Sequence, residues 1–535
     1  MFERLAGVMA LGAVLAVPFV LKPRDDLLDA SAESVVVVTP NNEAIRYEFA
    51  RAFREHERVQ RGRSVRVDWR TPGGTNEITR FMSSEYAASF ESYWRSRLKR
   101  AWTPRVAAAF ANPAVAPGSS GPDPADEKLA RRTFLESDVS SGIDLWFGGG
   151  SFEFAAHAAA GRLVDSGVVR AHPAIFNDEV VPMSLGGEPF WDREGRWVGT
   201  CLSGYGICFN RDVLAVLGAP EPAGFPDLAD PKFIGTVALA DPSKSGSAAK
   251  AFEMIVQQQM AERLAVLEAE GAPERDQRAP REGWQRAMRL IRRIGGNARY
   301  FTDSAAKIPL DVAAGDAAVG TCIDFYGRFQ SESTAPGGRS RMGFVMPRGG
   351  TSVGADPIGL LRGAPHRALA VEFMEFVLSE EGQKLWNFRV GTPGGPERYA
   401  LRRLPILPSL YAPAYAALRS DPEERPYEQA RSFTYRPAWT GPLFRVLAFL
   451  IRVMCVDAED DLKAAYRALV ERGFPPAATA AFDDVEEVDY AAATGPVRAA
   501  LASPDPRAEA ALANDLVTRL RARYGRVLSL AREGK

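Results

Sequence analysis

The chain has 535 residues, of which 46% are hydrophobic and 25% are charged, a composition typical of a soluble globular protein with two or three domains. The formal net charge of -1 excludes the strong global field that favours binding to nucleic acid or to an anionic membrane. The four histidines (His56, His157, His172 and His366) are far apart in the sequence and predict no histidine-rich metal site.

The N-terminal segment is typical of an export signal. Residues 5–21 form an almost unbroken apolar run, and "ASA" at residues 30–32 offers small residues for cleavage. The run also approaches the length that spans a bilayer. Residues 1–32 are therefore expected to be a signal peptide or an N-terminal anchor, which places the protein in the periplasm or outside the cell.

The four cysteines are Cys201, Cys208, Cys322 and Cys455, and none forms a Cys-x-x-Cys pair. Metal-site spacing is therefore absent. Two interpretations stay open: one disulfide between Cys322 and either Cys201 or Cys208 in an oxidising compartment, or free buried thiols.

Strand and helix patterns alternate after the leader. "SVVVV" at residues 34–38 predicts a buried strand, and a polar turn and an amphipathic helix follow it. The same pattern recurs with glycine turns at Gly73-Gly74 and at residues 148–150. This alternation predicts an α/β fold with a parallel sheet between helices. Ligands bind beyond the carboxyl ends of such strands, where these turns lie, so the turns predict a binding site.

A serine-rich turn precedes a helix in "ADPSKSGSAAKAFEMIV", residues 240–256. The first amide groups of a helix lack intrahelical partners and carry the positive end of the helix dipole. An anion can approach them where side chains are small, and the hydroxyl groups of Ser243, Ser245 and Ser247 around Gly246 add donors. The alternative is an ordinary serine cap.

The order of four longer motifs is more informative than any one of them. They are "DREGRWVGTCLSGYGICFNRDVL", "FPDLADPKFIGTVALADPSKSGSAAKAF", "VAAGDAAVGTCIDFYGR" and "DPIGLLRGAPHRALAVEFMEFVLSEEGQKLW". The series closely resembles the extracellular solute-binding proteins of ABC transporters, in the branch that holds ferric-iron and phosphonate binders. The resemblance covers residues 35–82 and 139–410.

The resemblance implies the type II fold of periplasmic binding proteins, in which two α/β lobes joined by crossing strands close on a ligand. It assigns residues 35–200 to the first lobe, with an insertion at 87–138, and residues 205–345 to the second. Residues 348–400 would return to the first lobe. Residues 401–535 would form a mostly helical C-terminal region outside the resemblance.

The resemblance also implies ligand-binding residues on both sides of the cleft. They are Asn41, Asn42, Gly74, Thr75, Gly150, Ser151, Tyr205, Ser243, Ser245, Gly246, Ser247, Asp324, Tyr326 and Asp356. Ferric binders carry adjacent tyrosines at the turn that matches "DFYG", and here Phe325 takes the first position. Three readings stay open for Asp324, Tyr326 and Asp356: an oxygen-rich metal site, two carboxylates that bind the ammonium of a zwitterion such as an aminophosphonate, or residues that only pack and cap.

The expected function is capture of a small oxyanion-bearing solute, a phosphonate or phosphate ester, by a monomer that delivers it to an ABC transporter permease in the inner membrane. No cofactor and no catalysis are expected. The alternatives are a ferric-iron binding protein, a membrane-anchored ligand sensor, or an enzyme. An enzyme needs a base or metal ligands near the serine turn, and the histidines fall outside the motifs.

Overall fold

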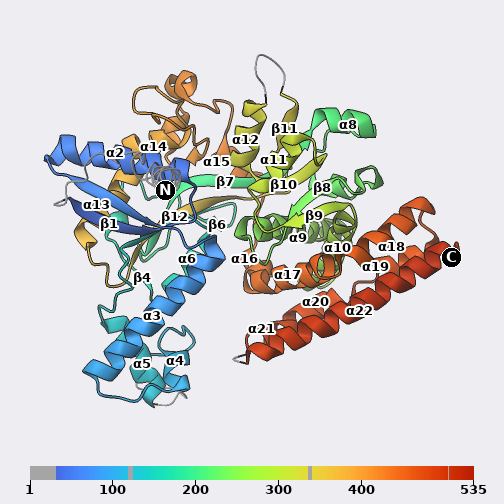
Figure 1. The fold of residues 1–535 in the computed structure, drawn as a ribbon, viewed down its shortest axis with the longest axis horizontal. Coiled ribbons are helices and arrows are strands. Elements are labelled where there is room, and N and C mark those ends of the chain that lie inside the picture. The colour runs from blue at the N-terminus through green and yellow to red at the C-terminus, as the bar shows by residue number, and fades with distance from the viewer. Residues whose placement is uncertain (1–31, 119–124, 335–339, 504) are drawn as a thin grey trace, which may run out of the picture.

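The computed structural model describes residues 32–118, 125–334, 340–503 and 505–535 (Figure 1). Apart from Ala32, the predicted export segment lies outside the described residues. The chain forms a mixed α/β structure of two lobes with a helical C-terminal region, as the sequence predicts.

The first lobe is built on three parallel strands, each followed by a helix. The strands are β1 (Glu33–Val38), β2 (Val65–Arg70) and β3 (Leu145–Phe147), and the helices are α2 (Glu43–Arg61), α3 (Thr75–Arg97) and α6 (Ser151–Ala160). They lie in the order β2-β1-β3, and α13 (Arg367–Leu378) and α14 (Glu380–Asn387) pack on the same core. The predicted parallel α/β pattern is confirmed.

The second lobe repeats the arrangement. Its sheet contains β8 (Val237–Ala240), β9 (Ala298–Thr302), β10 (Val319–Ile323) and β11 (Met342–Val345), and its helices include α8 (Arg211–Leu217), α9 (Gly246–Ala269), α10 (Arg275–Gly296), α11 (Lys307–Ala314) and α12 (Asp324–Ser333). Strand β8 lies between β9 and β10 and is parallel to both.

Two long strands, β7 (Trp197–Asn210) and β12 (Val353–Leu361), connect the lobes. Strand β7 pairs with β12 up to Gly204, and from Tyr205 onward it pairs with β10. A Cβ atom on Gly206 would lie 2.2 Å from the Val345 carbonyl oxygen, so this glycine permits close packing of β7 on β11.

The region around residues 87–138 packs as an aromatic cluster. Helix α3 passes through position 87, so the expected boundary of the insertion lies inside a helix. Its second half packs through Phe90 and Trp94 against α4 (Pro104–Ala109) and α5 (Ala125–Glu136).

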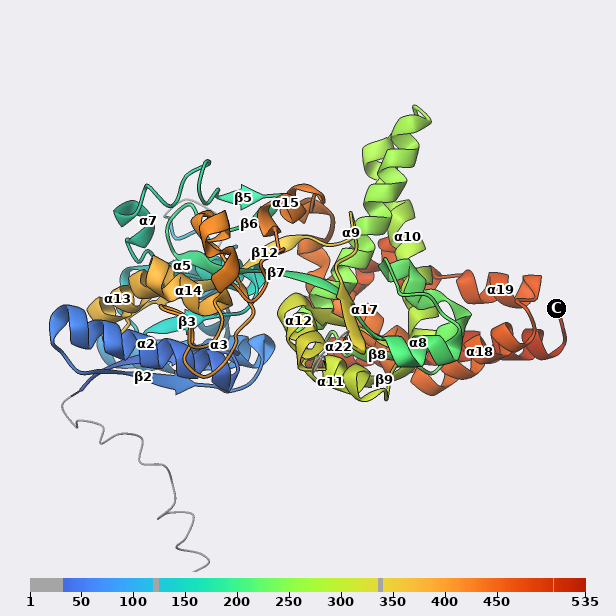
Figure 2. The ribbon, with the colours of Figure 1, turned by 90° about the horizontal axis from the view of Figure 1, so that it is seen from above.

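The C-terminal region is mostly helical. Its longer helices are α17 (Phe444–Ile451), α18 (Glu459–Glu471), α19 (Pro476–Asp483) and α22 (Pro506–Arg532). They share one apolar core with α9 and α10 and lie beside the second lobe, away from α2 and α13 (Figure 2). Within the described residues, Pro437–Val456 is the one helical run long and apolar enough to cross a membrane, and 56% of it is buried inside the protein.

All four cysteines are buried and free. Of the two interpretations of the cysteines, the structure therefore agrees with free buried thiols.

Candidate functional site

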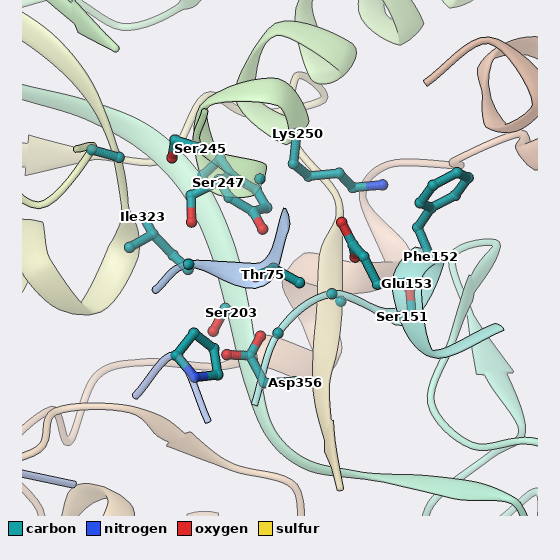
Figure 3. Close-up of a pocket in the computed structure, with 18 of the residues that line it drawn as sticks. Thr75, Ser151, Phe152, Glu153, Ser203, Ser245, Ser247, Lys250, Ile323 and Asp356 are labelled. Atoms are coloured by element: carbon teal, nitrogen blue, oxygen red, sulfur yellow. The ribbon is translucent and has the colours of Figure 1, made fainter. Parts of the chain in front are cut away.

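A cavity of about 650 Å³ lies between the lobes, where the strands of both sheets end (Figure 3). Of the residues expected at the site, the cavity wall contains Asn41, Asn42, Gly74, Thr75, Gly150, Ser151, Tyr205, Ser245, Gly246, Ser247, Tyr326 and Asp356. The polar turns that lie far apart in the sequence therefore meet around one space, although their part in ligand binding stays a prediction.

Three helices begin at this wall with small residues. The N-cap positions of α3 and α6 are Gly74 and Gly150, and neither has a side chain that satisfies the first amides. Ser245 caps α9, since its Oγ accepts a hydrogen bond of 3.3 Å from the Ala248 amide. The capping interpretation of this serine is correct, but its hydroxyl proton remains available to a ligand because a hydroxyl both donates and accepts.

Ser243 and Asp324 do not belong to the cavity wall. The Ser243 hydroxyl donates to Asp241 Oδ1 at 2.7 Å, so this serine stabilises the turn. Asp324 is buried at the start of α12 and pairs with Arg328 at 2.8 Å. Each of the two side chains is held by a partner that also lies outside the cavity wall.

Asp356 lines the cavity, but its carboxylate is paired with the guanidinium of Arg403. The pair of Asp324 and Asp356 that the sequence suggested as an ammonium or metal site is therefore not assembled. Arg403 also lies over the ring of Phe325, 4.1 Å from its centroid.

Tyr326 lines the cavity with its ring against Phe325, at a centroid distance of 4.1 Å. Burial raises the pKa of the Tyr326 phenol, and the charge of Arg403 and a hydrogen bond with Asn42 oppose this in part. A raised pKa disfavours the phenolate that a ferric ion requires. Across the described ranges, no group of three or more His, Cys, Asp or Glu side chains is arranged to hold a metal ion.

A buried ionic cluster in the wall has no signal in the sequence. Lys250 Nζ lies 2.8 Å from Glu188 Oε1 and 2.8 Å from Glu253 Oε2, and 3.9 Å from the centroid of the Tyr435 ring. Burial alone lowers the pKa of Lys250, but the two carboxylates outweigh it and hold the pKa well above its ordinary value. Lys250 is therefore charged and neutralises part of the acidic wall.

Glu153, in the first turn of α6, is another wall residue that was not predicted from the sequence. Its side chain projects into the same part of the cavity as that of Lys250 (Figure 3), and the residue is 8% exposed. Burial raises its pKa to about 7. A hydrogen bond from its own backbone amide and the charge of Lys250 oppose the shift, and Glu253 and Asp356 add to it. Its position three residues after Gly150, in a predicted site turn, was the available signal.

Comparisons with known proteins place most of this cavity in one matched segment. The family model of the bacterial extracellular solute-binding protein matches residues 143–405. An uncharacterized protein of Haemophilus influenzae is 27% identical over 244 residues, which are 45% of this chain and 60% of the relative. The phosphoglycerate transport regulatory protein PgtC of Salmonella typhimurium is 22% identical over 189 residues, which are 35% of this chain and 40% of the relative. The chain thus spans about 60% and 40% of the lengths of these curated relatives.

Two solved structures are also similar. The periplasmic binding protein AfuA from Actinobacillus pleuropneumoniae, with fructose-6-phosphate bound, has 18% identity and a TM-score of 0.42, over 66% of this chain and 82% of its own. Iron-bound HitA from Pseudomonas aeruginosa has 14% identity and a TM-score of 0.44, over 78% of this chain and 99% of its own.

Proposed function

We propose that the protein is the solute-binding component of an ABC importer, because residues 143–405 match the family model of the bacterial extracellular solute-binding protein. In this proposal it captures a small oxyanion-bearing solute, a phosphonate or a phosphate ester, between its two lobes and delivers it to a permease in the inner membrane. It performs no catalysis.

The observation that carries the proposal is the meeting of three helix starts at one cavity. The N-cap residues of α3, α6 and α9 are Gly74, Gly150 and Ser245, and all three line the wall. A helix start favours a negatively charged ligand, because its first amide groups and the positive end of the helix dipole both face that ligand. Each hydrogen bond to a charged group contributes about 1.5–3 kcal/mol.

The acidic residues of the wall are compatible with an anionic ligand. Glu188 and Glu253 are paired with Lys250, and Asp356 is paired with Arg403. Glu77 and Asp303 also line the cavity and are paired with Arg80 and Lys244. Glu153 has a pKa of about 7 and is therefore partly protonated near neutral pH. In its protonated form it offers a hydrogen-bond donor to an oxyanion, as a neutral carboxylic acid does.

Ferric iron is the second candidate, because Tyr326 lines the cavity and phenolate oxygen is a ligand for hard metal ions. The raised pKa of Tyr326 and the Arg403 partner of Asp356 both count against it.

Calorimetry tests the ligand class. The full chain is titrated with inorganic phosphate, methylphosphonate, 2-aminoethylphosphonate, sn-glycerol 3-phosphate and Fe(III)-citrate. We expect saturable binding of at least one phosphonate or phosphate ester. Binding of Fe(III)-citrate alone would replace the oxyanion proposal with the iron one.

The proposed export needs a separate test. N-terminal sequencing of the protein from its native host should find cleavage near Ala32, and fractionation should find the protein in the periplasm. An intact, membrane-bound N-terminus would favour a ligand sensor over a released binding protein.

A further inference from the structure

Part of the cavity wall comes from outside the matched domain. Tyr435, Pro437, Gly441 and Phe444 line the cavity, although the family match ends at residue 405. We define residues 435–444 as the C-terminal wall.

The C-terminal wall is attached to the first lobe at Tyr435. The amide of Tyr435 donates a hydrogen bond of 2.7 Å to the carbonyl of Gly186, in the turn between β5 (Ser184–Leu185) and β6 (Glu188–Pro189). A Cβ atom on Gly187 would lie 1.8 Å from the Tyr435 carbonyl oxygen, so only glycine allows this approach.

The next residue is attached to the second lobe. On α9, the Gln257 side chain accepts a hydrogen bond of 3.1 Å from the Arg436 amide and donates to the Arg436 carbonyl and the Thr440 hydroxyl, at 2.9 and 2.7 Å. The Tyr435 hydroxyl donates to Glu253 of the same helix at 2.8 Å. Because consecutive residues are fixed on opposite lobes, the wall has a defined position relative to both.

Phe444 and Phe152 both line the cavity. The Phe444 ring meets that of Phe152 on α6, with centroids 4.9 Å apart, so the contact joins the C-terminal region to the first lobe. Phe152 is 45% exposed, and Figure 3 places it beside Lys250 and Glu153, away from Ser245 and Ser247. The aromatic pair and the serine turn therefore lie on different sides of the cavity.

We propose that the C-terminal wall is a specificity element of the solute site, and that the Phe152–Phe444 pair limits the length of the group attached to the oxyanion. The inference rests on the proposed function, in which the oxyanion occupies the serine turn. A solute held there extends its remaining atoms toward Lys250 and the aromatic pair. A longer group meets two packed rings, whose contact it must break.

The first test measures the length preference. Calorimetry compares methylphosphonate with glucose 6-phosphate on the full chain and on Phe444→Ala and Phe152→Ala. We expect each variant to shift the affinity ratio toward the longer probe by at least tenfold. Phe329→Ala is the matched control, because Phe329 is a 46% exposed phenylalanine on α12 that does not line the cavity. It should leave the ratio unchanged.

The second test needs no ligand. Ser247→Cys places a thiol in the cavity, while the four native thiols are buried. In the Ser247→Cys protein, adding Phe444→Ala should raise the ratio of the labelling rate by a bulky maleimide to the labelling rate by iodoacetamide at least tenfold. Adding Phe329→Ala should not.

The two tests separate this inference from the proposed function. If Phe444→Ala speeds maleimide labelling but no oxyanion binds, the role of the C-terminal wall is supported and the proposed ligand class is wrong. If an oxyanion binds but the variants change neither the length preference nor the labelling rate, the role of the C-terminal wall is wrong and the proposed ligand class is supported. If neither labelling nor binding is seen, both are wrong.

Discussion

Lys250 of α9 and Glu188 of β6 join the two lobes through an ion pair of 2.8 Å across the cavity wall. The Lys250 side chain is 18% exposed and that of Glu188 is nearly inaccessible. A second polar contact crosses the cleft where the Asn76 side-chain Nδ2 donates to the Ser243 backbone carbonyl at 3.2 Å. Polar contacts therefore join the two lobes across the cavity.

Loss of Lys250 should destabilise the protein. Lys250→Met leaves Glu188 and Glu253 buried without their cation, which typically costs about 3–5 kcal/mol. Denaturant unfolding followed by circular dichroism measures the difference. Lys244→Met is the matched control, because Lys244 forms an exposed ion pair with Asp303 in the same region, and no measurable change is expected. Equal stabilities of Lys250→Met and wild type would show that the cluster contributes nothing to folding.

Ser245→Ala should weaken oxyanion binding by roughly ten- to a hundredfold, since a hydrogen bond to a charged group is lost. The same change removes a helix cap, which costs about 0.5–2 kcal/mol of stability. Ser379→Ala separates the two effects, because Ser379 caps α14 through the Gly382 amide and does not line the cavity. Both variants should lose stability, and only Ser245→Ala should lose affinity in calorimetry. A similar affinity in the two variants would remove the serine turn from the site.

Glu153 should make the stability depend on pH in a defined direction. Its pKa is about 7 in the folded protein against an ordinary value of 4.5. Between these values the folded state holds a proton that the unfolded state has lost, so the stability falls as pH rises, by at most about 1.4 kcal/mol per pH unit. Below pH 4.5 both states are protonated and the effect vanishes. Unfolding curves from pH 4.5 to 7.5 should therefore show a steeper decline for wild type than for Glu153→Gln. Parallel declines would contradict the assignment.

Tyr326→Phe distinguishes the two ligand classes. If the solute is an oxyanion, we expect its affinity to change by less than about threefold, because the three helix starts remain. If the cargo is Fe(III), the variant removes its only phenolate ligand at this turn and binding should be lost. Titrations of wild type and variant with the same phosphonate and with Fe(III)-citrate decide between them.

The α/β architecture and the positions of most cavity turns could be predicted from local sequence patterns. Strand and helix periodicities are local properties, so the alternation after residue 34 and the serine turn before α9 could be predicted. The carboxyl ends of parallel strands meet at one edge, which brought Gly74 and Gly150 together as expected.

Long-range packing, in contrast, controls which charged groups of the cavity wall are available to a ligand. Asp356 is neutralised by Arg403, 47 residues later in the chain, and Lys250 is covered by Tyr435, which lies far outside the matched domain. Such pairs form because segments that are distant in the sequence pack against each other and exclude water. The local spacing of residues along the chain does not indicate which distant residue will be the partner. The burial that raises the pKa of Glu153 and the contact of Phe152 with Phe444 arise in the same way.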